Sequence, residues 1–164
     1  MSSNLHIDRA TKEDVALLLT LIKELAEYER MGDQVVATEA ALRRALFSEP
    51  PEVEAMIARS SGEPIAFALF FRSFSTFMGR PGLYLEDLYV RPAYRGRGFG
   101  RRLLAHLARL AVARGCGRFE WSVLDWNELA ITSYRRAGAK PMDDWTVYRL
   151  TGDALERLAL EAEG

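Results

Sequence analysis

The chain has 164 residues, 49% of them hydrophobic, which is enough for one compact core and too few for two ordinary domains. Its 22 Lys and Arg residues nearly balance 23 Asp and Glu residues, so the overall charge gives no indication of a nucleic-acid partner. One cysteine and two histidines cannot supply a disulfide framework or a typical zinc site. We therefore expect a single domain, residues 1–164, with no metal.

No apolar run approaches the roughly 20 residues that span a bilayer. The first nine residues also lack the basic-then-apolar order of a signal peptide. We expect a cytoplasmic protein without a membrane partner.

The N-terminal third predicts one strand and two helices. Residues 5–9 alternate as a short strand, and Thr11 to Asp14 has the spacing of a reciprocal helix cap. A first helix then runs to about Tyr28, with apolar residues at intervals of three and four that form one buried face (Val15, Leu18, Leu19, Ile22 and Leu25). A second helix covers about 39–47, starting at Thr38.

The middle of the chain predicts a hairpin and then a strand, loop and helix. Residues 52–59 and 65–74 favour strands, and the turn-forming residues 60–64 separate them. A third strand covers 83–90. It is followed by a helix from Gly98 to about Arg114, which Gly115 ends.

The last third predicts three strands and two helices. A strand at 118–124 precedes a short helix that Asn127 caps and Gly138 ends. Two strands, at 139–142 and 145–150, lead to a C-terminal helix. Together these elements predict an α/β (α+β) fold, in which a mixed sheet has helices on both sides.

Glycine and arginine alternate in the segment Arg95-Gly96-Arg97-Gly98-Phe99-Gly100. The first N–H groups of a helix have no intrahelical partner, and the helix dipole favours negative charge there. The glycines let a pyrophosphate approach the backbone, and arginines at 95, 97, 101 and 102 add positive charge. The spacing fits neither a P-loop nor the dinucleotide fingerprint. It predicts a phosphate cradle, and the alternative is a turn that only joins strand to helix.

The same segment resembles the acetyl-CoA motif, Arg/Gln-x-x-Gly-x-Gly/Ala, of the GNAT family of N-acetyltransferases. The similarity continues through residues 84–90, 126–128 and 134–139. Residues 22–29 resemble the branch that acetylates spermidine, spermine and thialysine, whereas residues 47–77 match only weakly.

This resemblance implies the fold, the cofactor and the assembly. It implies a mixed, mostly antiparallel central sheet of six to seven strands with helices on both faces. It implies acetyl-CoA as cofactor, with coenzyme A as product, and a homodimer that forms through an edge strand or the C-terminal segment. The cofactor-binding residues it implies, together with the cradle, are Leu88, Tyr89, Val90, Arg95, Gly96, Arg97, Gly98, Phe99, Gly100, Arg101, Asn127 and Ala130.

Acetyl transfer to an alkyl ammonium, with a pKa near ~10.4, needs a base, and the departing thiolate is better served by a proton donor. Glu86 and Asp87 are neighbours in an apolar strand, so alternation points them to opposite faces. The resemblance selects Glu86 as the base, acting through an ordered water, and Tyr134 as the acid, with Asn127 on the cofactor arm. Without it, the carboxylates fit a solvated strand edge, Asn127 a helix cap and Tyr134 a half-buried tyrosine. No acetyl-enzyme is implied, and Cys116 fits a turn.

A cationic acceptor needs carboxylates and aromatic faces. The candidates for substrate binding are Glu27, Tyr28, Glu29, Glu86, Asp87 and Trp145. The first three also fit a solvated helix end, and Asp143-Asp144 before Trp145 fits an ordinary turn.

Branch similarity predicts a small-molecule amine as substrate: a diamine, a polyamine or a lysine-like amino acid. Two alternatives stay open. One is another amine acceptor, such as an aminoglycoside or a protein N-terminus or lysine. The other is a regulatory module that binds acetyl-CoA without turnover, against which the presence of both Glu86 and Tyr134 argues.

Overall fold

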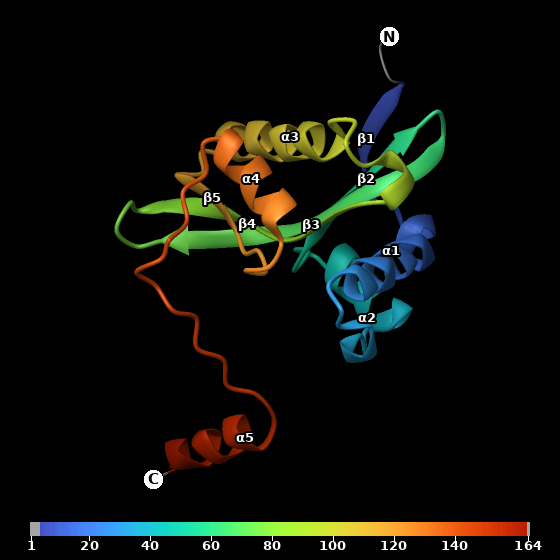
Figure 1. Cartoon of the computed structure of the whole chain (residues 1–164). Helices are drawn as coiled ribbons and strands as arrows, with labels where there is room; N and C mark the ends of the chain where they lie inside the picture. Colours follow the sequence, from blue (N-terminus) through green and yellow to red (C-terminus); the bar gives the residue numbers. More distant parts are fainter. Residues whose placement is uncertain (1–3, 164) are drawn as a thin grey trace. The chain divides into compact units, whose positions relative to one another are not determined.

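The computed structural model describes residues 4–163, and the chain divides into two compact units, Met1–Asn127 and Glu128–Gly164 (Figure 1). Each unit is described by itself. Within the described residues, no helix has the length and apolar character that crossing a membrane requires.

The first unit is built on a five-stranded sheet in the order β1-β2-β3-β4-β5. The strands are β1 (Leu5–Arg9), β2 (Glu54–Ser60), β3 (Glu63–Ser75), β4 (Arg80–Val90) and β5 (Arg118–Trp121). The first four form an antiparallel meander, whereas β5 pairs in parallel with β4. A parallel neighbour requires a crossover, and helix α3 (Phe99–Ala113) supplies it.

Helices cover both faces of this sheet. Helices α1 (Val15–Tyr28) and α2 (Glu39–Phe47) lie on one face and α3 lies on the other (Figure 1). The α1 side is closed by a cluster of buried residues from α1, α2 and the strands, among them Leu18, Leu46, Ile57 and Phe67. The predicted α/β architecture, a mixed sheet with helices on both sides, is confirmed.

Local signals place the helix ends where the sequence predicts them. Asp14 Oδ2 accepts a hydrogen bond from the Thr11 backbone N–H at 2.8 Å, and Thr38 Oγ1 accepts one from the Ala41 N–H at 3.1 Å. Short 3-10 segments add to these elements at Lys12–Asp14, Gly32–Gln34 and Pro92–Tyr94. The buried face of α1 is also close to the prediction, except that Leu21 is fully buried and Leu19 and Ile22 only partly.

The second unit contains α4 (Glu128–Arg136), α5 (Gly152–Leu160) and a 3-10 turn at Glu161–Glu163. Gly138 follows α4 with a φ of +92°, which is the predicted left-handed stop. The predicted strands at 139–142 and 145–150 are wrong. Within the described residues this stretch has no strand, because its backbone meets no partner strand, and Trp145 N–H closes a turn onto the Met142 carbonyl at 3.1 Å.

The size of the sheet is corrected accordingly. The strand predicted at 118–124 ends at Trp121, and the described residues form five strands, not six to seven.

Candidate active site

Strand β4 carries a bulge at Glu86. Leu85 lies opposite Phe70 of β3 and Asp87 lies opposite Leu69, so Glu86 is the extra residue between two matched pairs. Because Phe70 and Leu69 are neighbours that point to opposite faces, Leu85 and Asp87 do so as well. The simple alternation expected along 83–90 is therefore interrupted at Glu86, and the acidic pair sits where the strand changes phase.

Acidic side chains gather around Asp87. Burial, followed by the negative charges of Glu86 and Glu29, raises the pKa of Asp87 from 3.8 to about 6. Burial also raises the pKa of Glu29, which follows the last residue of α1. Glu27, by contrast, is exposed, with its carboxylate against Gly32. A group of carboxyls that disfavour each other's ionisation is stabilised by a cationic ligand.

The predicted cradle lies at the start of α3. Gly96 and Gly98 have φ angles of +73° and +81°, and no atom lies within 4 Å of where a Cβ would stand on either. Gly98 caps α3 without a side chain, and the first intrahelical bond runs from Arg102 N–H to Gly98 O at 3.0 Å. The N–H groups of residues 99–101 precede that bond, so they suit an anion.

The aromatic neighbours of the cradle order Arg97. Its guanidinium lies 5.6 Å from the ring centre of Tyr94 and 5.1 Å from that of Phe99, whose side chain is buried. Arg101 is exposed on the first turn of α3. Positive charge therefore flanks the open N–H groups, and the donor set fits the pyrophosphate of coenzyme A.

The backbone of β4 is open along one edge. Its β3 side is paired as far as Val90, but β5 pairs with β4 only over Gly82–Leu85. In the part of the chain that the structure describes, residues 86–90 thus face no strand on the β5 side. An extended ligand can add there as a further strand, as predicted for Leu88, Tyr89 and Val90.

Tyr28, predicted to bind substrate, lies among residues predicted to bind the cofactor. The Arg95 guanidinium is 4.4 Å from its ring centre and 5.5 Å from that of Tyr89. Arg95 Nε also donates to the Val90 carbonyl at 2.9 Å. The Tyr28 hydroxyl donates to Asn127 Oδ1 at 3.3 Å. The structure therefore brings Tyr28, Arg95 and Asn127 together at the end of α1.

Three predicted site residues belong to the second unit. Ala130 and Tyr134 lie in α4, which starts directly after Asn127. Trp145 follows the turn at Asp143 and Asp144 and is 73% exposed. Their roles stay predictions.

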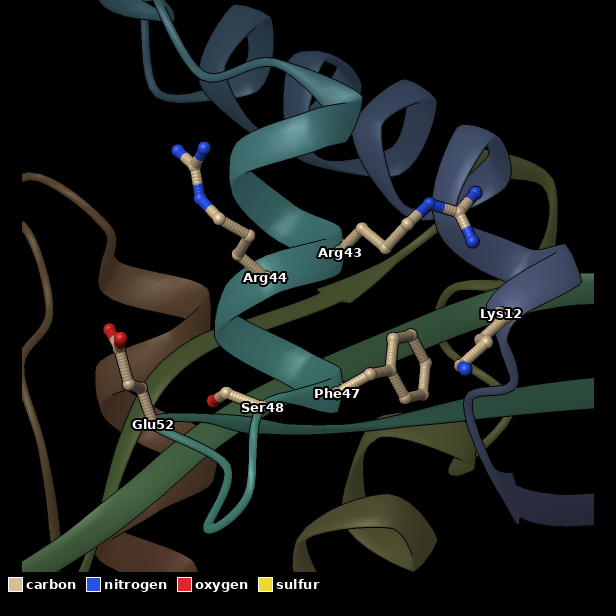
Figure 2. A pocket seen from close by; sticks show the side chains of 6 residues that line it. All are labelled: Lys12, Arg43, Arg44, Phe47, Ser48 and Glu52. Carbon is tan, nitrogen blue, oxygen red and sulfur yellow. The ribbon is translucent and has the colours of Figure 1, made fainter.

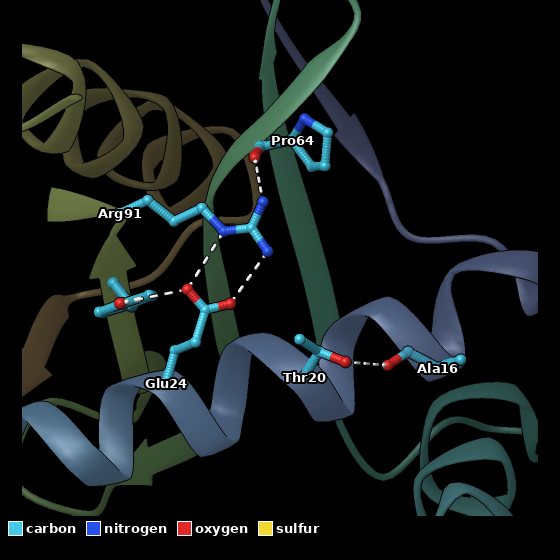
Figure 3. Close-up of polar contacts among 6 residues, drawn as sticks. Ala16, Thr20, Glu24, Pro64 and Arg91 are labelled. Carbon is cyan, nitrogen blue, oxygen red and sulfur yellow. Dashed lines mark hydrogen bonds and ion pairs between the residues drawn. The ribbon is translucent and has the colours of Figure 1, made fainter. Parts of the chain in front are cut away.

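A clamp between α1 and the end of β4 has no signal in the sequence (Figure 3). Glu24 accepts hydrogen bonds from Arg91 Nη2 at 2.9 Å and Nε at 3.2 Å, and from the Tyr89 hydroxyl at 3.4 Å. Arg91 Nη1 also donates to the Pro64 carbonyl at 3.0 Å. The partners stand 67 residues apart. Only the fold pairs them, and the pairing fixes α1 beside the strand that leads into the cradle.

The most prominent hollow of the first unit lies elsewhere. It measures about 470 Å³, it is lined by Lys12, Arg43, Arg44, Phe47, Ser48 and Glu52, and it includes no predicted site residue (Figure 2). Among residues 4–163, no group of three or more His, Cys, Asp or Glu side chains is placed to hold a metal ion.

Comparisons with known proteins agree with this geometry. The model of the acetyltransferase (GNAT) family matches residues 18–139. Thialysine N-epsilon-acetyltransferase of Bos taurus is 38% identical, over 93% of this chain and 96% of that protein. L-ornithine N5-acetyltransferase NATA1 of Arabidopsis thaliana is 32% identical, over 93% of this chain and 87% of that protein.

A solved structure extends the similarity to three dimensions. An integron cassette protein from the mobile metagenome of V. cholerae superposes with a TM-score of 0.79 at 30% identity, over 95% of this chain and 98% of that one. The family match covers the acidic bulge, the open edge of β4 and the cradle. The chain belongs to the acetyltransferase (GNAT) family and is an N-acetyltransferase.

Proposed function

We propose that this N-acetyltransferase uses acetyl-CoA and acetylates a primary amine of a small cationic acceptor, either a diamine or polyamine or an amino acid with an amine-bearing side chain. The observation that carries the proposal is the acidic group of Glu29, Glu86 and Asp87 beside the open edge of β4. A buried carboxyl with a raised pKa gains most from a neighbouring cation. The relatives named for thialysine and L-ornithine support an amine on a side chain.

The cofactor site is proposed to combine three parts of the chain. The N–H groups of residues 99–101, with Arg97 and Arg101, bind the pyrophosphate. The backbone of 88–90 binds the extended arm, with help from Asn127 and Ala130. Acetyl-CoA supplies the acetyl group as a thioester, and an N–H group of 88–90 polarises its carbonyl.

Two side chains are proposed to move protons. Glu86 is exposed at the bulge, so an ordered water can reach it and pass on the proton that the acceptor ammonium loses. Tyr134 supplies a proton to the departing thiolate. The free amine attacks directly in a ternary complex, and no side chain carries the acetyl group. Asp87, Glu29 and Trp145 then hold the rest of the cationic acceptor.

Thiol release from acetyl-CoA tests this function. The assay compares polyamines, diamines, lysine analogues, aminoglycosides and peptides as acceptors. Turnover on a diamine or lysine analogue, lost in Glu86→Gln and in Tyr134→Phe, is the expected result. The matched controls are Glu156→Gln and Tyr148→Phe, whose side chains are exposed. Tight binding of acetyl-CoA without turnover on any amine contradicts the proposal.

We also propose that residues 1–164 act as one domain and assemble as a homodimer. The family match runs across the boundary between the two units, which supports one domain. Exposed apolar side chains along the second unit, such as Trp145, Val147 and Leu158, favour a partner surface. The cytoplasmic location stays a prediction.

A further inference from the structure

Tyr28 makes two separate contacts that leave from different parts of one side chain. Its hydroxyl donates to Asn127 Oδ1 at 3.3 Å, and its ring face lies 4.4 Å from the Arg95 guanidinium. Its ring edge also meets Trp126, with 5.9 Å between ring centres. The partners come from the loop that opens the cradle and from the residue before α4. A single residue of α1 therefore touches two separate segments of the cofactor site.

The hydroxyl contact orients an amide. A side-chain amide is planar, with its oxygen and its NH₂ group on opposite arms. When Oδ1 of Asn127 accepts from Tyr28, the NH₂ group is turned away from α1. The bond therefore selects one of the two amide orientations, and the donor end is the one that a carbonyl on a cofactor arm requires.

The ring contact orients the first residue of the cradle. Arg95 is held between the rings of Tyr28 and Tyr89, and its Nε is tied to the Val90 carbonyl. A guanidinium over two aromatic faces is attracted by both ring quadrupoles. Without the Tyr28 ring, Arg95 keeps one ring and one hydrogen bond, and its side chain gains rotamer freedom just before Gly96.

The element that carries Tyr28 is itself anchored. Glu24 lies one helical turn earlier in α1, and its two hydrogen bonds to Arg91 join that turn to the end of β4 (Figure 3). A side chain on an anchored helix positions its partners more accurately than one on a loop.

From these contacts we propose that Tyr28 is a positioning residue of the cofactor site. Its hydroxyl sets the Asn127 amide, and its ring sets the Arg95 side chain. This assignment rests on the proposed use of acetyl-CoA, and it moves Tyr28 from the acceptor side of the site to the cofactor side. Substitutions at Tyr28 consequently act on cofactor affinity and leave the acceptor affinity unchanged.

Calorimetric titration of coenzyme A measures this effect without turnover. Tyr28→Phe keeps the ring and removes the hydroxyl, so its Kd is expected to rise by about 2- to 10-fold. Tyr28→Leu also removes the ring face, which adds about 2- to 5-fold. The matched control is Tyr84→Phe, which loses the 2.9 Å contact with Ser122 Oγ far along β4 and is expected to bind coenzyme A as the wild type does.

A double-mutant cycle shows whether the hydroxyl acts through Asn127. In the Asn127→Ala background, Tyr28→Phe is expected to leave the Kd unchanged. In the wild-type background, steady-state kinetics are expected to show a higher KM for acetyl-CoA and an unchanged KM for the amine. A purely structural role predicts neither pattern.

The outcomes separate this assignment from the proposed function. If the wild type binds coenzyme A and Tyr28→Phe binds it equally well, or raises only the KM of the amine, the positioning role is wrong and the proposed function stands. An effect of the same size in the Asn127→Ala background overturns the hydroxyl's part in it. A wild type that binds no coenzyme A overturns the proposed function and this assignment together.

Discussion

Replacement of Asp87 by Asn removes a buried charge that the free protein pays to keep. Burial and the nearby Glu86 and Glu29 raise the pKa of Asp87 from 3.8 to about 6. Between these two values the folded protein binds more protons than the unfolded chain, so its stability falls as the pH rises. The cost is complete above pH 6. The shift corresponds to about 3 kcal/mol at pH 7.5 and about half of that at pH 5.

The neutral, isosteric Asn lacks this pH-dependent cost. For a chain of this length, Asp87→Asn is expected to raise the Tm by about 6–12 °C at pH 7.5 and by about half as much at pH 5. Thermal unfolding followed by circular dichroism at both pH values measures the two shifts. Asp144→Asn, at an exposed turn, is the matched control and is expected to leave the Tm unchanged.

The comparison between the two pH values carries the test. An equal Tm gain at pH 5 and pH 7.5, or a loss at pH 7.5, refutes the inference that ionisation of Asp87 destabilises the free protein. A saturating polyamine is expected to stabilise the wild type more than Asp87→Asn, because the cation offsets a charge that only the wild type carries.

Two further predictions concern the clamp and the cradle. Glu24→Gln removes the charge that holds Arg91, and it is expected to lower the free energy of unfolding by about 1–2 kcal/mol in urea titration; an unchanged midpoint would show that the clamp adds no stability. Gly98→Ala places a Cβ at a φ of +81°, and it is expected to cost about 1–2 kcal/mol and to weaken coenzyme A binding. Because an added Cβ meets no atom within 4 Å, Gly62→Ala, at a φ of +83° in the β2–β3 turn, is the control: the same stability loss with normal binding is expected.

The features that sequence analysis predicted well depend on neighbours in the chain. The cap at Thr38, the stop at Gly138 and the strand, glycine loop and helix around Gly98 are each fixed within a few residues. The cradle could be predicted because its chemistry is that of one helix start. The family motif then identified the cofactor class.

The features that were missed depend on distant partners. A segment such as 145–150 has strand composition, but whether it forms a strand is decided by what lies beside it. The contacts of Glu24 with Arg91 and of Tyr28 with Arg95 each join residues 67 positions apart. No local pattern announces them. The bulge at Glu86 was missed because alternation was assumed on both sides of it.

That bulge has a consequence for how the strand tolerates length changes. Because Leu85 already faces Phe70 and Asp87 already faces Leu69, deletion of Glu86 leaves every other β3–β4 pair in its present register. The ladder would close into a regular one, with no side chain moved to the wrong face. Glu86 is thus an insertion that the fold itself does not require, and a one-residue deletion here separates what the sheet needs from what the chemistry needs.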